Sequence, residues 1–561
     1  MTRQPFLPEL CPIEAATAQM SVGTNDDRGA IFTRREVANF ILDLCGYKVG
    51  KSLYERSLLE PSFGAGDFLI PAVERLLIDW QTNALSLPAR ELCRCIRGVE
   101  LHAASVEQTR AALFDLLAQH NIDAVDASAL VTSWLRQGDF LMVELDQEFD
   151  YVIGNPPYVR PERVPDALMR EYRDRYSTMF DRADIYVGFF ERSLQVLAPN
   201  GKLGFICADR WMKNRYGEPL RKLISSKFHL AVYVDMYGVD AFHADVVAYP
   251  AITIVERTSG SETRIAFRPE IRSEVLDNLA AQLTSELPIA TSNVYARVTP
   301  IDGAPWLFDA SGVIDIVRSI EARFPTLEEA GCQVGIGVAT GADQIFIGDY
   351  EHLDVEADRK LPLVMTKDIR SGQLQWQGKG VINPFRDEGG LVDLAQYPRL
   401  RAYLSSHEAG LKARHVARKS AASWYRTIDR IYPELTGKPK LLIPDIKGAA
   451  HVVLDDGNYY PHHNLYYVTS SAWDLRALRV VLRSPITFAF ITSYATKMRG
   501  GYLRFQAQYL RRLRLPQWDT IAPVEQAELI ALDATGDSEA CATAVARLYG
   551  LTDEEAAMLR G

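Results

Sequence analysis

The sequence predicts an α/β protein built on a doubly wound, largely parallel sheet, and three observations support this prediction. Strand-like apolar runs alternate with helix-like segments over roughly the first 260 residues, a pattern typical of parallel sheets. A glycine turn at 64–66 follows the first of these apolar runs. After about residue 300 the expected strands become shorter and the turns more frequent, which indicates a second, mixed α+β domain.

The first expected elements surround the glycine turn. Apolar residues at helical spacing predict a helix over 34–46, with Thr33 as a suitable N-cap. The stretch 57–80 then combines a short buried strand, the turn and an amphipathic helix. Further strands are expected at 95–101, 149–154 and 201–208, with helices over 102–120 and around 186–198.

Length and composition predict a soluble protein of two or three domains. The chain has 561 residues, of which 47% are hydrophobic and 24% are charged. No apolar run reaches the length of a membrane span, and the N-terminus lacks the apolar core of a signal peptide, so we expect a cytoplasmic protein without membrane contact. The seven cysteines are scattered, and Cys93 and Cys95 are too close for a zinc knuckle. We therefore expect reduced thiols and no metal.

Charge is distributed unevenly along the chain. The net charge is −10, yet residues 401–520 carry 19 Lys and Arg against 8 Asp and Glu. A local basic surface, rather than the total charge, is what favours contact with phosphates. Ordinary variation between domains would also explain the imbalance, so charge alone leaves both interpretations open.

Polar residues and glycines follow three successive expected strands. Gly64 and Gly66 let the backbone approach a ligand closely, and Glu100 ends the next strand, where a carboxylate can accept hydrogen bonds from two ribose hydroxyls. Asp139, in the stretch RQGDF, comes at the end of a further candidate strand that precedes 149–154, and there it can accept from the amine of an adenine. Each carboxylate alone is better explained as a helix cap or a solvated turn residue, but the ordered set indicates a nucleoside cofactor. Leu69 stands where the dinucleotide signature has its third glycine, so S-adenosyl-L-methionine fits better than NAD.

The stretch FDYVIGNPPYVRP places an amide, two prolines and a phenol directly after an expected strand. An aromatic amine is a poor nucleophile because its lone pair is delocalised, and an enzyme can help by accepting hydrogen bonds from both of its N–H groups. The side-chain carbonyl of Asn155 and the backbone carbonyl of Pro156 are suitable acceptors. Pro157 adds stiffness to the loop, and Tyr158 offers a flat face for a base. A proline-rich turn capped by asparagine is the alternative explanation.

The motif order GAIFTRREV, LEPSFGAGDF, GVEL, GDF and NPPY resembles the gamma-type DNA adenine-N6 methyltransferases of restriction–modification systems. The resemblance is strong over 30–255 and weaker over 325–515, where LPLVMTKDI, KPKLLIPDIKG and RGGYLRFQAQYLRRLRLP are similar to the recognition domain of Taq-type enzymes. It implies four parts, namely an N-terminal arm at 1–30, a Rossmann-like S-adenosyl-L-methionine-dependent methyltransferase domain at 31–265, a DNA target-recognition domain at 295–520 and an acidic helical tail at 521–561.

The resemblance also implies roles for individual residues. The expected contacts with S-adenosyl-L-methionine are Thr33, Glu60, Phe63, Gly64, Gly66, Glu100 and Asp139. Asp67 departs from the small hydroxyl or apolar residue of many relatives. The catalytic loop runs from Asn155 to Tyr158, and Phe242 is the expected second aromatic against the target base, with Tyr249 near enough to compete. The basic residues expected near DNA are Lys438, Lys440, Lys447, Arg499, Arg504, Arg511 and Arg512.

Together these features predict a site-specific methyltransferase that acts on N6 of an adenine flipped out of double-stranded DNA. Methyltransferases of RNA or of protein glutamine use the same loop and are an alternative, which the basic C-terminal half disfavours. A catalytically inactive DNA-binding module is a further alternative, which the intact loop disfavours. We expect a monomer. We also expect restriction to belong to a separate endonuclease, because about 30 residues before the methyltransferase pattern are too few for a nuclease domain.

Overall fold

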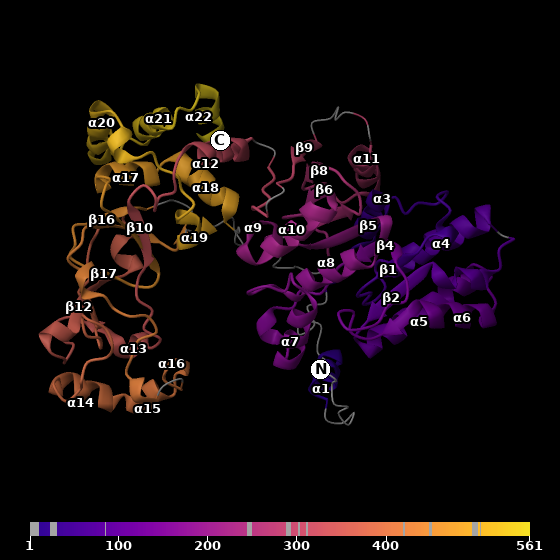
Figure 1. Ribbon diagram of the computed structural model, residues 1–561, viewed down its shortest axis with the longest axis horizontal. Helices are drawn as coiled ribbons and strands as arrows, with labels where there is room; N and C mark the ends of the chain where they lie inside the picture. The colour runs from indigo at the N-terminus through magenta and orange to yellow at the C-terminus, as the bar shows by residue number, and fades with distance from the viewer. Residues whose placement is uncertain are drawn as a thin grey trace. The chain divides into compact units, whose positions relative to one another are not determined.

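The computed structural model describes residues 11–22, 31–84, 86–243, 250–285, 287, 293–300, 303–309, 312–418, 421–447, 451–495, 503–504 and 506–560. The chain forms two compact units, Met1–Ala310 and Ser311–Gly561 (Figure 1). Among the described helices, none combines the length and the apolar character of a membrane-spanning segment.

Unit 1 is built on a nine-stranded sheet with the order β3-β2-β1-β4-β5-β7-β6-β8-β9. Its five strands from β3 to β5 are parallel, whereas β7 runs antiparallel to both of its neighbours. The strands are β1 (Leu58–Glu60), β2 (Ile96–Glu100), β3 (Leu135–Gln137), β4 (Phe149–Gly154), β5 (Leu197–Ala208), β6 (His229–Asp235), β7 (Pro250–Glu256), β8 (Glu262–Phe267) and β9 (Tyr295–Val298). The prediction of a doubly wound, largely parallel sheet is confirmed.

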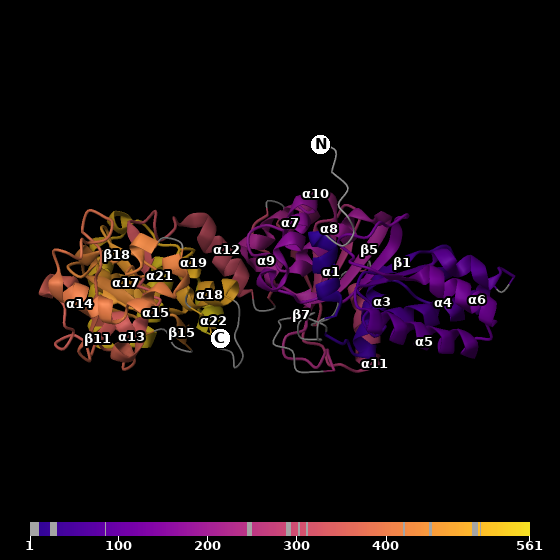
Figure 2. The ribbon, with the colours of Figure 1, turned by 90° about the horizontal axis from the view of Figure 1, so that it is seen from below.

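Side chains of the central strands alternate between two hydrophobic clusters, one on each face of the sheet. Leu58 and Ile153 enter the first cluster, while their chain neighbours Leu59 and Val152 enter the second. The first cluster is closed by α3 (Arg35–Cys45), α4 (Leu69–Asn83), α5 (Ala103–Gln119), α6 (Ala124–Trp134) and α11 (Ser273–Leu283). The second is closed by α1 (Pro12–Ser21), α7 (Asp166–Arg175), α8 (Ile185–Gln195), α9 (Arg210–Lys213) and α10 (Glu218–Lys227). Figure 2 shows α8 and α10 above the sheet and α5 and α11 below it.

The strand order reverses between β1 and β4. From β1 the chain adds β2 and β3 on one side, and it then returns to place β4 on the other side of β1. At such a reversal the loops after the two adjacent strands diverge, so a crevice opens at their carboxyl ends. This is where the glycine turn and the catalytic loop both begin.

Thr33 is not the N-cap of the helix that follows it. The N-cap position of α3 is Arg34, and no side chain caps this helix end. Thr33 instead forms an isolated β-bridge with Phe242, and its N–H donates to Asp67 Oδ2 at 2.7 Å. At the other end, Gly46 adopts φ 78°, and its N–H closes the last turn on Leu42 and Asp43. Thr33 therefore makes tertiary contacts instead of forming the helix cap that the local sequence pattern predicts.

Unit 2 has the mixed α+β character that the sequence predicts. It holds two four-stranded sheets, in the orders β10-β18-β14-β16 and β11-β13-β12-β17, and the pair β15-β19. The strands are β10 (Cys332–Ile336), β11 (Ile347–Asp349), β12 (Lys360–Val364), β13 (Lys379–Ile382), β14 (Lys440–Pro444), β15 (Ile446–Lys447), β16 (Val453–Asp455), β17 (Tyr460–Pro461), β18 (Leu465–Ser470) and β19 (Leu503–Arg504). The longer helices are α12 (Val313–Arg323), α14 (Pro398–Ser406), α17 (Leu475–Leu482) and α18 (Pro485–Tyr494).

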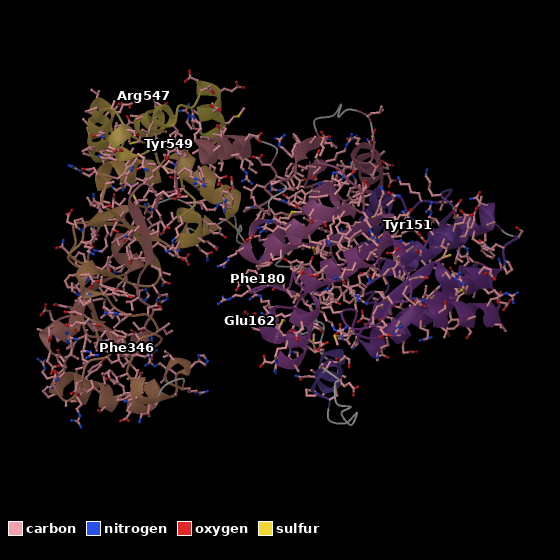
Figure 3. All side chains as sticks on the ribbon, viewed as in Figure 1. Tyr151, Glu162, Phe180, Phe346, Arg547 and Tyr549 are labelled. Carbon is pink, nitrogen blue, oxygen red and sulfur yellow. The ribbon has the colours of Figure 1, made fainter. Side chains whose placement is uncertain are left out.

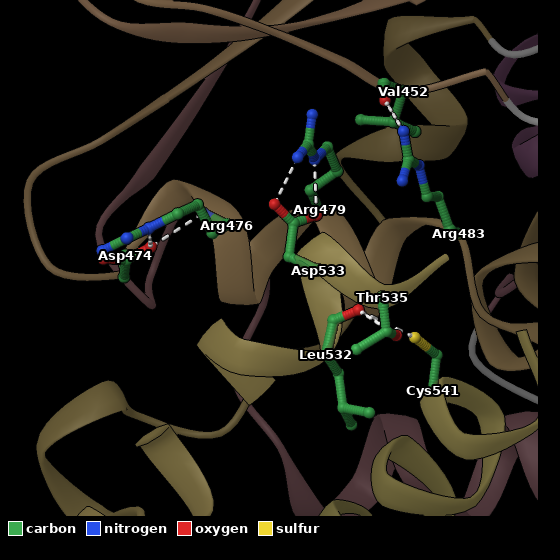
Figure 4. Close-up of polar contacts among 9 residues, drawn as sticks. All are labelled: Val452, Asp474, Arg476, Arg479, Arg483, Leu532, Asp533, Thr535 and Cys541. Atoms are coloured by element: carbon green, nitrogen blue, oxygen red, sulfur yellow. Dashed lines mark hydrogen bonds and ion pairs between the residues drawn. The ribbon is translucent and has the colours of Figure 1, made fainter. Parts of the chain in front are cut away.

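The compact units differ in their limits from the expected domains. The strands β8 and β9 extend the sheet of unit 1 beyond residue 265. The expected tail is helical, with α20 (Pro523–Thr535), α21 (Ser538–Leu548) and α22 (Asp553–Arg560), but it belongs to unit 2. Arg479 of α17 pairs with Asp533 of α20, and the two bonds of this pair are drawn in Figure 4. Charge along the sequence marked this segment as a separate tail, whereas this pair ties it to the rest of the unit.

Candidate active site

A pocket opens at the reversal between β1 and β4, and loops from four strands line it. Its wall includes the glycine turn after β1, Glu100 at the end of β2, Asp139 after β3 and Asn155 after β4. These residues lie up to 91 positions apart in the chain, and they meet because the carboxyl ends of parallel strands share one edge of the sheet. The described pocket thus contains Thr33, Glu60, Phe63, Gly64, Glu100, Asp139, Asn155 and Pro157 of the predicted set.

Glycine is required in the turn at 64–66 for its backbone conformation and, at Gly66, also because a side chain would not fit. Gly64 and Gly66 adopt φ 51° and 90°, in the left-handed region that other residues avoid. A Cβ on Gly66 would lie 2.8 Å from the side chain of Ile70. The hydroxyl of Thr109 on α5 donates to the carbonyl of Gly64 at 3.0 Å and holds the turn from behind. The backbone of the turn therefore forms part of the pocket wall in one fixed shape.

Glu100 joins the glycine turn to the start of α5. Its Oε2 accepts the N–H of Gly64 and its Oε1 accepts the N–H of His102, both at 2.9 Å. The residue is only 9% exposed, yet it lines the pocket. Each carboxylate oxygen has two lone-pair sites, so both oxygens can accept one further hydrogen bond from a ligand.

Asp139 has a partner that the sequence did not indicate. The hydroxyl of Tyr172 donates to its Oδ2 at 2.6 Å, and the N–H of Leu141 donates to its Oδ1 at 2.9 Å. Burial raises the pKa of Asp139 above its usual value, and the two hydrogen bonds act in the opposite direction. Tyr172 lies on α7, 33 residues away, and no local pattern links it to the site.

Glu60 and Asp67 add two more carboxylates to the pocket. Glu60 is 1% exposed, and its Oε2 has no hydrogen-bond partner among the described residues. Burial, together with the charges of Asp67 and Glu100, raises the pKa of Glu60 well above its usual value. An unmatched, buried carboxyl group is costly, and a cationic or hydrogen-bond-donating ligand would relieve that cost. Asp67 differs in that its Oδ2 already accepts from Thr33.

Asn155 is held in one orientation. Its Nδ2 donates to the carbonyl of Ile31 at 2.9 Å and to Oγ1 of Thr33 at 3.3 Å. Its Oδ1 is buried and has no partner in the described part of the chain. The hydroxyl of Ser62 also fixes the loop, because it donates to the backbone carbonyl of Asn155 at 3.1 Å. The residues Ile31 and Ser62 therefore belong to the site, and the sequence analysis missed both.

The aromatic residues of the predicted site differ in how they are placed. Tyr158 is half-buried, with its ring centroid 6.4 Å from that of Tyr186, and its hydroxyl is buried without a described partner. Phe242 is 7% exposed and packs in the core cluster of α3 and α11, and it is not among the residues that line the pocket, although it is bridged to Thr33, which is. The alternative residue, Tyr249, lies outside the described residues. Phe140, which the sequence analysis did not name, lines the pocket beside Asp139.

The structure corrects one of the basic residues expected near DNA. Lys440 is fully buried, and its Nζ lies 2.8 Å from Asp455 Oδ2, so it cannot reach a phosphate. Lys438, two residues earlier, is exposed. Arg511 pairs with Glu328, and Arg512 pairs with Glu321 and lies over the ring of Tyr494. The remaining three lie beyond the description, since Arg499 is outside the described residues and only the backbone is described for Lys447 and Arg504.

Comparison with known proteins identifies the family of this chain. Residues 78–242 match the family model of Eco57I restriction-modification methylases. The chain is 55% identical to the Type II methyltransferase M.PaeR7I of Pseudomonas aeruginosa, with 100% of this chain and 98% of the relative covered. It is 49% identical to M.XhoI of Xanthomonas vasicola, over 94% of this chain and 98% of the relative.

A solved structure shows a similar fold. The Type IIL restriction-modification enzyme MmeI, determined in complex with DNA, superposes with a TM-score of 0.57 at 13% identity, covering 94% of this chain and 74% of that chain. At this identity the likeness concerns the fold alone. The full-length relatives, in contrast, are close enough to define the family. The chain therefore belongs to the Type II methyltransferases of restriction–modification systems, and its cofactor is S-adenosyl-L-methionine.

Proposed function

We propose that this methyltransferase modifies N6 of an adenine in double-stranded DNA. The observation that carries the proposal is the buried Oδ1 of Asn155, an acceptor that has no partner in the described structure and stands at the wall of the pocket. When bound, S-adenosyl-L-methionine supplies a methyl group on a positively charged sulfur. The residues of the chain must bind this cofactor, orient the target amine and exclude water.

The residues of the pocket fit the cofactor. Glu100 keeps one acceptor site on each oxygen, which suits a pair of ribose hydroxyls. Asp139 likewise keeps an acceptor site beside the apolar ring of Phe140, which suits the amine edge and the face of an adenine. The unmatched Oε2 of Glu60 suits a donor or a cationic group, and the cofactor carries both. Four acidic residues in one pocket favour a ligand with net positive charge.

Asn155 and Pro156 would orient the target amine. Because Ile31 and Thr33 accept hydrogen bonds from the Asn155 amide nitrogen, only its oxygen remains for a substrate. Pro156 offers a carbonyl and has no N–H that could compete for the lone pair of the amine. Two fixed acceptors draw on both N–H bonds of an exocyclic amine and favour a tetrahedral nitrogen. Such preorganised acceptors act mainly in the transition state.

Adenine N6 lies inside the duplex, so the base has to leave the helix to reach the loop. This step costs a few kcal/mol, and stacking on an aromatic ring offsets part of the cost. Tyr158 is the described aromatic residue of the catalytic loop, and its ring packs beside that of Tyr186. Phe242 remains a predicted second contact, and its burial in the core means that it would have to move to reach a base.

Unit 2 would choose the DNA sequence. Its exposed Lys438 and the excess of basic residues over 401–520 are suited to phosphate contacts. If so, DNA affinity should fall steeply with salt, because each neutralised phosphate adds a log–log slope of about 0.9. An affinity that does not change with salt would place recognition elsewhere. We further propose that the enzyme acts as a monomer and that a separate endonuclease cuts the same site.

The proposal is tested by identifying the methylated product. The purified chain is incubated with labelled cofactor in three parallel reactions, which contain duplex DNA, RNA or protein. The products are hydrolysed, and the methylated component is identified by mass spectrometry. We expect N6-methyladenine from duplex DNA alone. Methylated cytosine in DNA would overturn the choice of base, and label in RNA or in a glutamine side chain would overturn the choice of substrate. Asn155→Ala serves as the control for label introduced by a contaminating enzyme.

A further inference from the structure

A cluster of Asp343, His462 and His463 lies in unit 2 and takes no part in the methyltransferase pocket. One ring nitrogen of each histidine and a carboxylate oxygen of Asp343 all lie within 4.8 Å of one another. Asp343 begins the short helix α13 (Asp343–Phe346), and the histidines form the turn between β17 and β18. Phe346, at the other end of α13, is labelled in Figure 3. The cluster joins segments that are 119 residues apart.

The geometry of the cluster suits a small metal ion. The distance from His462 Nε2 to Asp343 Oδ2 is 3.2 Å, and the two imidazole rings are 4.1 Å apart with an angle of 51° between their planes. Ligands of a four-coordinate zinc ion at bond lengths near 2.0–2.1 Å are about 3.3 Å from one another. The carboxylate and the first imidazole therefore already stand at the spacing of two metal ligands.

Both histidines also bury a ring nitrogen that nothing in the described structure satisfies. Nδ1 of His462 and Nδ1 of His463 are buried and have no hydrogen-bond partner among the described residues. His462 as a whole is 2% exposed, so bulk water does not compensate its ring. A buried polar group without a partner is rare in folded proteins and indicates an unseen ion, water or ligand. Because Nε2 of His462 is the nitrogen beside Asp343, and one imidazole offers one nitrogen to an ion, Nδ1 of His462 would stay outside the site. Of the two unpartnered atoms, Nδ1 of His463 is the one that an ion could satisfy.

The backbone around the cluster is fixed before any ion binds. The N–H of Val338 donates to the carbonyl of Pro461 at 2.9 Å, and the N–H of His463 donates back to the carbonyl of Val338 at 3.1 Å. At Gly337, a Cβ would lie 2.2 Å from the carbonyl oxygen of His462, so only glycine fits. The hydroxyl of Thr340 binds the second oxygen of Asp343 at 2.5 Å. These contacts fix the backbone of both histidines and the carboxylate of Asp343 without help from a ligand, as a preorganised site requires.

We propose that Asp343, His462 and His463 bind one divalent transition-metal ion of the zinc type. Two imidazoles and one carboxylate suit Zn²⁺ and its first-row neighbours, whereas Mg²⁺ and Ca²⁺ prefer oxygen ligands. Three protein ligands leave a fourth position for water. The ion would tie the segment 337–343 to the β17–β18 turn and so brace this end of unit 2. The proposal does not depend on the methyl-transfer reaction or on its substrate.

The test uses the full-length, tag-free protein after removal of metal with a chelator. Titration with ZnCl₂ in a calorimeter should show one bound ion, and the melting temperature should rise on addition of one equivalent. CoCl₂ in place of ZnCl₂ should produce the visible absorption bands of four-coordinate Co²⁺. The variants His463→Ala and Asp343→Asn should each weaken Zn²⁺ binding by about tenfold or more. Asp343 has a side chain that is 46% exposed, so its conservative change is compatible with folding even if a histidine variant is not.

The matched control is His352→Ala. His352 also pairs with an aspartate three residues away, at 2.9 Å from Asp349, but the pair is exposed and is not part of any three-ligand group among the described residues. This variant should bind Zn²⁺ as tightly as the unaltered protein. The proposal is overturned if the unaltered protein binds no stoichiometric Zn²⁺, or if Asp343→Asn and His463→Ala bind it undiminished. Loss of the ion in His352→Ala alone would also overturn it.

Discussion

The methyltransferase pocket of unit 1 and the Lys440–Asp455 pair of unit 2 both bury charged or polar groups, but they satisfy them differently. Lys440 is matched completely, by Asp455 at 2.8 Å and by two backbone carbonyls at 2.9 Å. In the pocket, Oε2 of Glu60 and Oδ1 of Asn155 have no partner among the described residues. A buried group that its own chain matches contributes to stability, whereas an unmatched group at a pocket wall is available to a ligand. The four variants below test this distinction.

The largest effect is expected for Lys440→Met, and it should be an effect on stability. Removing one partner of a buried ion pair leaves the other charge uncompensated and typically costs about 3–5 kcal/mol. Urea denaturation should therefore show a large loss in the free energy of unfolding. The matched control is Lys438→Met, because Lys438 is exposed on the same segment and should change stability by less than about 0.5 kcal/mol.

DNA affinity should respond in the opposite way to the same two substitutions, with the larger loss for Lys438→Met. If Lys438 contacts a phosphate, Lys438→Met should lower the affinity for all DNA sequences and reduce the salt slope by about one unit. A stable, folded Lys440→Met with weakened DNA binding would show that Lys440 leaves its buried site to contact DNA.

Asn155→Ala should leave the fold and the cofactor affinity intact while methyl transfer falls by about a hundredfold or more. The variant removes the unmatched Oδ1, and this atom is proposed to act mainly in the transition state. Single-turnover kinetics with duplex DNA measure the rate. Ser62→Ala is the control within the same loop, because it removes only a hydrogen bond to the backbone carbonyl of Asn155 and should cost less than about tenfold. Transfer at the normal rate by Asn155→Ala would remove this residue from the mechanism.

Glu100→Ala should weaken the binding of S-adenosyl-L-methionine by about 1–3 kcal/mol, as measured by calorimetry. Part of the loss would come through the glycine turn, because Glu100 also accepts the N–H of Gly64. Glu107→Ala on the exposed face of α5 is the control and should bind the cofactor normally. If Glu100→Ala keeps both its fold and its cofactor affinity, the carboxylate does not bind the cofactor.

The sequence predicted the parts of unit 1 that local patterns determine. The alternation of Leu58 and Leu59 between two cores follows from the two-residue period of a strand, and the turn needs Gly66 for its backbone angle. Residues brought in by tertiary contact could not be predicted in this way, such as Tyr172 on α7 and the carbonyl of Ile31.

Unit 2 was predicted less well, because a count of charges does not report burial. Lys440 contributed to the basic excess over 401–520 although it lies in the core. The helices after residue 520 looked like a separate acidic tail, yet the pair between Arg479 and Asp533 ties them to the unit. Both errors concern charged residues whose partners lie far away in the sequence, and a local sequence pattern does not show such pairs.

The smallest effect is expected for Tyr172→Phe, and it should depend on pH. The hydroxyl of Tyr172 donates to Asp139, and this bond favours the ionised carboxylate. Burial already raises the folded-state pKa of Asp139, so ionising this group lowers stability as pH increases. Without the hydroxyl the pKa should rise further. The loss in the free energy of unfolding should therefore be small in acid, where Asp139 is protonated, and reach about 1–3 kcal/mol at alkaline pH.

Tyr176→Phe is the matched control for this pH dependence. Its hydroxyl donates to the backbone carbonyl of Leu141 at 2.6 Å, the same length as the Tyr172 bond, but a carbonyl does not titrate. Urea denaturation of both variants over a pH series that begins near the ordinary aspartate pKa of about 3.9 and extends to about pH 8 should show a cost that grows with pH for Tyr172→Phe and stays nearly constant for Tyr176→Phe. Equal pH dependence in the two variants would mean that the hydroxyl of Tyr172 does not control the ionisation of Asp139. In that case the ionisation of Asp139 would depend on burial, which raises its pKa, and on the hydrogen bond from the N–H of Leu141, which lowers it.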